Sequence, residues 1–121
     1  MGFHMHKTGE IDDIQKFEKD ILNSYKLIEE IIPRYRSTYF SHIFSGGYSS
    51  GYYSYIWSEV LDSDAFSMFK TEGLFNKKTA DSFRKNILER GGSAEPMKLY
   101  IKFRGKKPDV EPLLEKRGLL G

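Results

Sequence analysis

Residues 42–57 of this 121-residue chain read His42-Ile-Phe-Ser-Gly46-Gly47-Tyr48-Ser-Ser-Gly51-Tyr52-Tyr-Ser-Tyr55-Ile-Trp57. Glycine gives the backbone conformational freedom and lets a ligand approach the main chain closely. Tyrosine combines an apolar ring with a hydroxyl that donates hydrogen bonds. A glycine loop followed by phenols is suited to holding an extended polar ligand, so the stretch indicates a peptide-binding loop that leads into a helix.

The chain after this loop carries the periodicity and the end signals of helices. Apolar residues predict a helix over about residues 52–70, with Gly73 as its left-handed cap. Further helices are expected over residues 77–90 behind an Asn76 cap, over residues 94–104 between Ser93 and Gly105, and over residues 110–117 before Gly118. This half of the chain therefore predicts packed helices joined by short connections.

The chain before the loop predicts one more helix and one extended piece. Apolar residues in steps of three and four form one stripe over residues 10–32, and Pro33 is expected to end that amphipathic helix. Residues 34–44 are rich in aromatic and β-branched residues, which favours a short extended segment near residues 38–44. The predicted fold is mainly all-α: a helical subdomain over residues 10–121, preceded by an unstructured tail or expression remnant over residues 1–9.

Composition excludes several classes of function. The net charge of +2 comes from 19 basic and 17 acidic residues that are mixed along the chain, so no basic face for nucleic acid is expected. No apolar run is long enough to cross a bilayer, and residues 1–10 do not resemble a signal peptide. The chain has no cysteine, which fits a cytoplasmic protein and is also compatible with a bacterial periplasm.

The tyrosines and the histidine of the loop are the candidate functional residues. Tyr48, Tyr52 and Tyr55 follow one another in steps of four and three, so their side chains share a face if the helix begins early enough. An aromatic core stripe has the same spacing, and periodicity alone does not separate the two interpretations. His42 is the only histidine in the part expected to fold, and a lone histidine is more often structural than catalytic.

Other catalytic patterns are missing from the sequence. It contains no His-Glu-x-x-His, no Gly-x-Ser-x-Gly and no phosphate-binding glycine loop. Asp62 and Asp64 are two apart and would point in different directions on a helix. We therefore expect this chain to bind no metal and to be poorly equipped as an enzyme by itself.

The glycine-tyrosine run resembles a region of the thimet oligopeptidase family of zinc metallopeptidases. The similarity covers about residues 33–120 and continues in order through Glu59-Val-Leu, Asp64-Ala-Phe66, Phe83-Arg84, Ile87-Leu88, Arg90-Gly-Gly-Ser93, Phe103-Arg-Gly105, Pro108 and Arg117-Gly118-Leu119. The spacing of six residues between His42 and Tyr48 is similar to the bacterial peptidyl-dipeptidase branch, with oligopeptidase A as the near alternative.

The resemblance implies a role for each residue of the loop. In such peptidases the zinc is held by a His-Glu-x-x-His helix and a glutamate, all upstream of the region seen here. Residues matching His42, Tyr48 and Tyr55 bond the backbone of a short peptide substrate and the developing oxyanion, and Tyr52 helps to line the site. The surrounding glycines, Gly46, Gly47 and Gly51, let the loop close over the peptide.

The sequence and the resemblance leave two hypotheses for the chain as a whole. The first is a carboxyl-terminal fragment of a zinc oligopeptidase, inactive alone and self-associating through apolar helix faces that lack their neighbours. The second is a free-standing helical module that binds peptides or a partner protein.

Overall fold

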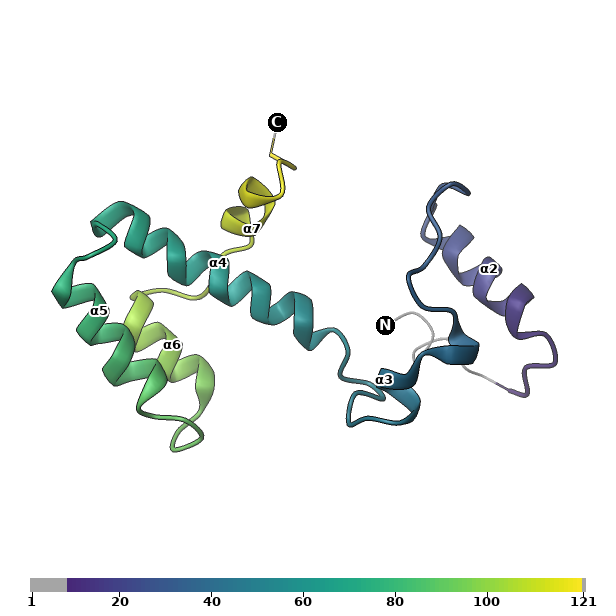
Figure 1. Ribbon diagram of the computed structural model, residues 1–121, viewed down its shortest axis with the longest axis horizontal. Helices are drawn as coiled ribbons and strands as arrows, with labels where there is room; N and C mark the ends of the chain where they lie inside the picture. The colour runs from purple at the N-terminus through teal and green to yellow at the C-terminus, as the bar shows by residue number, and fades with distance from the viewer. Residues whose placement is uncertain (1–8, 121) are drawn as a thin grey trace. The chain divides into compact units, whose positions relative to one another are not determined.

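The computed structural model describes residues 9–120, which form helices and loops in two compact units, one ending at Ser54 and the next beginning at Tyr55 (Figure 1). These residues contain no strand, which confirms the all-α fold. Among the helices so described, none has the length and apolar character that crossing a membrane requires. The tail expected over residues 1–9 lies almost entirely outside the described part.

The first unit contains α2 (Ile14–Ser24), a 3₁₀ turn (Ser37–Tyr39) and the single-turn helix α3 (Ser41–Phe44). Asp13 caps α2, since its side chain accepts a hydrogen bond from the Lys16 N–H at 2.9 Å. Glu18 and Ile21 are the buried residues of this helix. The buried Glu18 carboxylate is paired with Arg36 at 3.4 Å, which ties the following segment to α2.

The helix expected over residues 10–32 is wrong at both ends. It ends at Ser24, because Lys26 takes a left-handed conformation with φ of 56°. The Leu27 N–H then donates to the Leu22 carbonyl at 3.2 Å, which closes the helix in a Schellman pattern. Beyond this point Ile28 and Ile32 remain more than half exposed, so no packing within the unit stabilises further helical turns.

The extended segment expected near residues 38–44 is also wrong. The chain there forms the 3₁₀ turn and then α3, with Phe40 between them. Aromatic and β-branched residues favour a strand only where a neighbouring strand offers a surface to pack on. No strand lies in residues 9–120, and the aromatic rings of this segment pack on one another instead.

The second unit is built on the long helix α4 (Ser54–Glu72). It continues through α5 (Lys77–Phe83), a π-helical turn (Arg84–Leu88), α6 (Pro96–Arg104) and α7 (Glu111–Lys116). Its core is formed by Ala65, Tyr100 and Phe103, with partly buried Leu61, Met68, Phe69, Phe83 and Ile87 packed around them. The π-helical turn that follows α5 packs against α6, and the Phe83 and Phe103 rings meet with centroids 5.1 Å apart (Figure 1).

Most helix ends in this unit agree with the sequence. Gly73 and Gly105 have φ of 103° and 82°, as expected for left-handed caps, and Asn76 accepts hydrogen bonds from two amides of the first turn of α5. The Ser93 cap is wrong, because α6 is capped by the Glu95 side chain, which accepts from the Met97 N–H at 3.1 Å. Pro96 explains the shift, since proline disfavours helical backbone in the residue before it and suits the first helical position itself.

Candidate functional site

Four aromatic side chains of the first unit gather around the imidazole of His42. Its ring centroid lies 5.5 Å from that of Tyr52, 5.7 Å from Tyr35, 6.1 Å from Tyr48 and 6.2 Å from Phe40. We call these five residues (Tyr35, Phe40, His42, Tyr48 and Tyr52) the His42 cluster. It brings together three of the residues that the sequence singled out and two that it did not.

Turns, not a long helix, bring these residues together. His42 lies on the single turn of α3, and the loop that follows folds back through a hydrogen bond from the Gly51 N–H to the Tyr48 carbonyl at 3.1 Å. A Cβ atom on Gly46 would lie 3.2 Å from the His42 carbonyl oxygen, so this position favours glycine. A Cβ atom would meet no atom within 4 Å at Gly47 and only an ordinary contact at Gly51.

The common helical face expected for the three tyrosines does not form. Helix α4 begins at Ser54, so Tyr48 and Tyr52 precede it and only Tyr55 is helical. Tyr48 and Tyr52 meet at the His42 ring instead, and Tyr55 lies in the first turn of α4 as part of the other unit. The three side chains share no helical face because residues 49–53 form turns, and the helix begins only after them.

The exposure of the phenols does not fit an aromatic core stripe. The side chains of Tyr48 and Tyr55 are 37% and 50% exposed, and neither belongs to the core of the second unit. Tyrosine in a core is largely buried with its hydroxyl satisfied by protein groups. Tyr48 and Tyr55 are therefore only partly buried.

Sequence reasoning missed Tyr35 and Phe40. The Tyr35 ring stacks on Phe40 with centroids 5.1 Å apart, and the Phe40 ring meets Tyr52 edge-on at 4.7 Å. The guanidinium of Arg34, the preceding residue, lies over the Tyr35 ring at 5.2 Å from the ring centroid. The signal for these residues is the aromatic content of residues 34–44, which by itself favours an extended segment.

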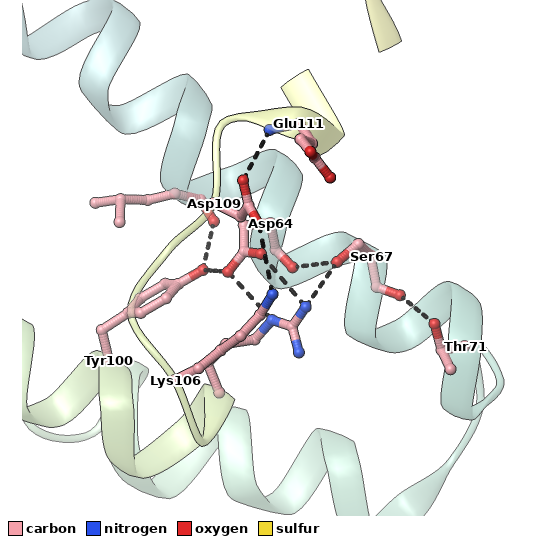
Figure 2. A network of polar contacts seen from close by, with 9 residues as sticks. Asp64, Ser67, Thr71, Tyr100, Lys106, Asp109 and Glu111 are labelled. Carbon is pink, nitrogen blue, oxygen red and sulfur yellow. Dashed lines mark hydrogen bonds and ion pairs between the residues drawn. The ribbon is translucent and has the colours of Figure 1, made fainter. Parts of the chain in front are cut away.

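A second polar network joins α4 to α6 and was also missed (Figure 2). Asp64 is completely buried and accepts hydrogen bonds from the Tyr100 hydroxyl at 2.6 Å and from Arg104 Nε at 3.1 Å. Arg104 Nη2 also donates to Ser67 Oγ at 3.1 Å. Burial, followed by the hydrogen bond to Asp64, raises the pKa of Tyr100.

The contacts of Asp64 indicate a structural role, because they join two helices. Tyr100 and Arg104 are four residues apart, so both side chains lie on the face of α6 that meets Asp64. That spacing was the signal in the sequence, because one buried acid facing a tyrosine and an arginine is a typical interhelical pairing. The same view shows Asp109 accepting from the Glu111 N–H at the start of α7, a bond that lowers the pKa of Asp109 (Figure 2).

The part of the chain that the structure describes does not bring metal ligands together. In residues 9–120 no group of three or more histidine, cysteine, aspartate or glutamate side chains is placed to hold a metal ion. A catalytic zinc takes three such ligands and keeps one position open. The zinc that the family resemblance implies therefore has no ligand set in this part of the chain.

Comparison with known proteins identifies the relatives of the chain. Residues 2–119 match the model of Peptidase family M3. Oligopeptidase A of Escherichia coli (strain K12) is 57% identical over 82 residues, which are 68% of this chain and 12% of that protein. Oligopeptidase A of Haemophilus influenzae is 45% identical over 118 residues, which are 98% of this chain and 17% of that protein.

A second kind of relative is similar over nearly the whole chain. Dipeptidyl carboxypeptidase of Escherichia coli (strain K12) is 40% identical over an alignment of 121 positions, which covers 98% of this chain and 18% of that protein. The chain thus spans less than a fifth of the length of each of these relatives. These findings confirm the family resemblance and its bacterial branch.

Proposed function

Since this chain belongs to Peptidase family M3, we propose that it forms the substrate-binding and transition-state-stabilising portion of a zinc-dependent oligopeptidase that hydrolyses short peptides. The observation that carries the proposal is the His42 cluster, where the imidazole meets the phenols of Tyr48 and Tyr52 beside a glycine loop. This grouping supplies several hydrogen-bond donors next to backbone that can approach a ligand closely.

The chemistry of peptide hydrolysis explains what these donors do. Attack of water on the scissile carbonyl makes a tetrahedral intermediate whose oxygen carries more negative charge than the carbonyl did. Donors aimed at that oxygen stabilise the transition state more than the bound substrate, and so raise kcat. We assign this role, and hydrogen bonding to the substrate backbone, to His42, Tyr48 and Tyr55.

The remaining loop residues have supporting roles in the proposal. Tyr52 lines the site beside His42, and the glycines at 46, 47 and 51 allow the loop to close over the peptide and exclude water. The space around Gly47 and Gly51 supports this role, because steric contact alone does not require glycine at either position. In the proposal the nucleophile and its activation come from another part of the parent protein, which agrees with the lack of a His-Glu-x-x-His motif in this sequence.

We expect the isolated chain to be inactive, because an oxyanion donor without a nucleophile has nothing to stabilise. The test compares the 121-residue chain with a chimera in which it replaces the matching segment of Escherichia coli oligopeptidase A. Each is given excess zinc and a quenched fluorogenic peptide. We expect turnover only from the chimera, and a chelator should abolish it.

Each other outcome contradicts part of the proposal. A folded chimera that cleaves no peptide would show that the chain does not supply this half of a peptidase site. Chelator-sensitive turnover by the isolated chain would show that it carries a complete site of its own.

A further inference from the structure

We propose that Tyr35 and Phe40 are positioning residues that hold the His42 imidazole and the Tyr52 ring in the orientation needed for catalysis. This inference rests on the proposed function, because it gives the two residues a part in the same site. It extends that function to residues outside the loop of residues 42–57, in a segment that the sequence alone presented as a strand.

Phe40 is the most connected ring of the His42 cluster outside the loop. It stacks with Tyr35 at an interplanar angle of 21°, meets Tyr52 at 81° and meets His42 at 65°. Stacked and edge-on pairs at such separations are favourable aromatic geometries. Tyr35 reaches the imidazole as well, at 5.7 Å, so the two rings together form one wall against His42.

The backbone around His42 has little regular structure. Helix α3 has only four residues, and one isolated helical turn is not stable by itself. The residues from Ser45 to Tyr53 form turns and bends. The orientation of the imidazole therefore depends on side-chain packing more than it would on a long helix.

The same segment contains matched aromatic residues that point elsewhere. Tyr35 and Phe40 are half-buried, whereas Tyr39 and Phe44 are 59% and 73% exposed. Tyr39 is thus a ring of the same size, next to Phe40 in the chain and largely in solvent. It provides a control that separates the effect of the aromatic wall from a general loss of aromatic residues.

The first test uses the isolated 121-residue chain and needs no activity. The ¹H–¹³C signal of the His42 imidazole, assigned by its loss in His42→Gln, is recorded in Phe40→Leu and Tyr39→Leu. We expect Phe40→Leu to move the signal because it removes a neighbouring ring current, and Tyr39→Leu to leave it in place. An unmoved signal in Phe40→Leu would overturn the proposal.

The second test measures kcat and KM in the active chimera. Phe40→Leu and Tyr35→Leu are expected to lower kcat about tenfold with a smaller change in KM, since small misplacement of a catalytic group is costly. Tyr35→Phe keeps the ring and should retain the wild-type rate, and Tyr39→Leu should also retain it. Circular dichroism of each variant checks that the helices are intact.

The outcomes distinguish this inference from the proposed function. If Tyr48→Phe lowers kcat and Phe40→Leu does not, the positioning role is wrong and the proposed function stands. If neither substitution lowers kcat, the proposed function itself is contradicted. Equal losses in Tyr35→Leu and Tyr35→Phe would also overturn the positioning role, because the ring would then not be what matters.

Discussion

Asp64 of α4 carries a buried charge whose partners lie on a second helix, α6. Its carboxylate is removed completely from water and is held by Tyr100 and Arg104. Burying a charge is costly, and its partners offset that cost only while all of them are present. The network therefore fixes how α4 and α6 meet, because any shift between these helices leaves a buried charge unpaired.

This burial predicts a large difference between two neighbouring aspartates. Asp64→Asn should lower the free energy of unfolding by about 3 kcal/mol, since it leaves Arg104 without its charged partner. Asp62→Asn is the matched control: Asp62 is 74% exposed, and its pair with Lys116 at 3.9 Å should contribute less than about 1 kcal/mol. Urea denaturation of both variants measures the difference, and equal losses would contradict the structural role of Asp64.

The raised pKa of Tyr100 predicts how the free energy of unfolding depends on pH. Burial raises the pKa of Tyr100 above its ordinary value of 10.0. Above about pH 10 the unfolded chain releases this proton while the folded chain keeps it, so the free energy of unfolding falls by about 1.4 kcal/mol per pH unit. Tyr100→Phe lacks the proton, so its stability deficit relative to wild type should shrink from pH 10 to pH 11.

The measurement for Tyr100 is urea denaturation of both proteins at each pH. The other tyrosines and the lysines titrate in both proteins and cancel in the comparison. A deficit that stays constant over this range would show that the Tyr100 hydroxyl is not shielded as the structure indicates.

At the scale of elements, the residues that end α2 include one in a strained backbone conformation. Lys26 has φ of 56°, a left-handed conformation that costs a residue with a Cβ about 1–2 kcal/mol. Lys26→Gly removes that strain, and we expect it to raise hydrogen-exchange protection of the α2 amides about fivefold. Lys19→Gly places the same change inside α2 and should lower protection, since glycine is a poor helix former.

The two lysine variants test the end of α2 directly. If Lys26→Gly lowered protection as Lys19→Gly does, the helix would have to continue through residue 26. That result would favour the longer helix that the apolar stripe of residues 10–32 predicts.

The helix ends that the sequence predicted correctly depend on local chemistry. Gly73, Asn76 and Gly105 act through their own backbone or side chain within one turn, so their roles are readable from the residue type. The long first helix and the extended segment failed because both depend on packing partners. A stripe of isoleucines predicts a helix only if another surface covers it.

The candidate site was predictable to a similar degree. His42, Tyr48 and Tyr52 stood out through their composition and do lie together. Their arrangement was not predictable, because turns over residues 49–53 replace the helical face that the spacing offered. Tyr35 and Phe40 were missed because ring contacts across the 3₁₀ turn and the single turn of α3 leave no periodic signal in the sequence.

At the scale of the whole molecule, large apolar side chains remain at the surface. Phe75 is 98% exposed, and more than half of the side chain is exposed at Ile28, Ile31, Ile32, Phe44, Leu74, Leu88 and Leu119. Large apolar side chains at the surface favour contacts with other polypeptide. In the proposed function that polypeptide is the remainder of the parent peptidase.

The isolated chain is therefore expected to self-associate. Sedimentation velocity should show species heavier than the 14.1 kDa chain as concentration rises. The double variant Ile28→Lys/Ile32→Lys should weaken this association, because it puts charge on the apolar segment after α2, whereas Phe75→Lys tests the other unit. A monomer at every concentration would contradict the expectation.

In the proposed function, tyrosine hydroxyls of this chain stabilise the oxyanion of peptide hydrolysis. Tyr55→Phe in the active chimera removes one hydroxyl and keeps the ring, and Tyr53→Phe is its control two residues earlier, with a side chain of nearly equal exposure. We expect Tyr55→Phe to lower kcat by about 10² to 10³, as loss of an oxyanion donor does, and Tyr53→Phe to leave it unchanged. A loss below about threefold in Tyr55→Phe, where an oxyanion donor predicts a far larger one, would contradict the claim and leave the phenol a packing role.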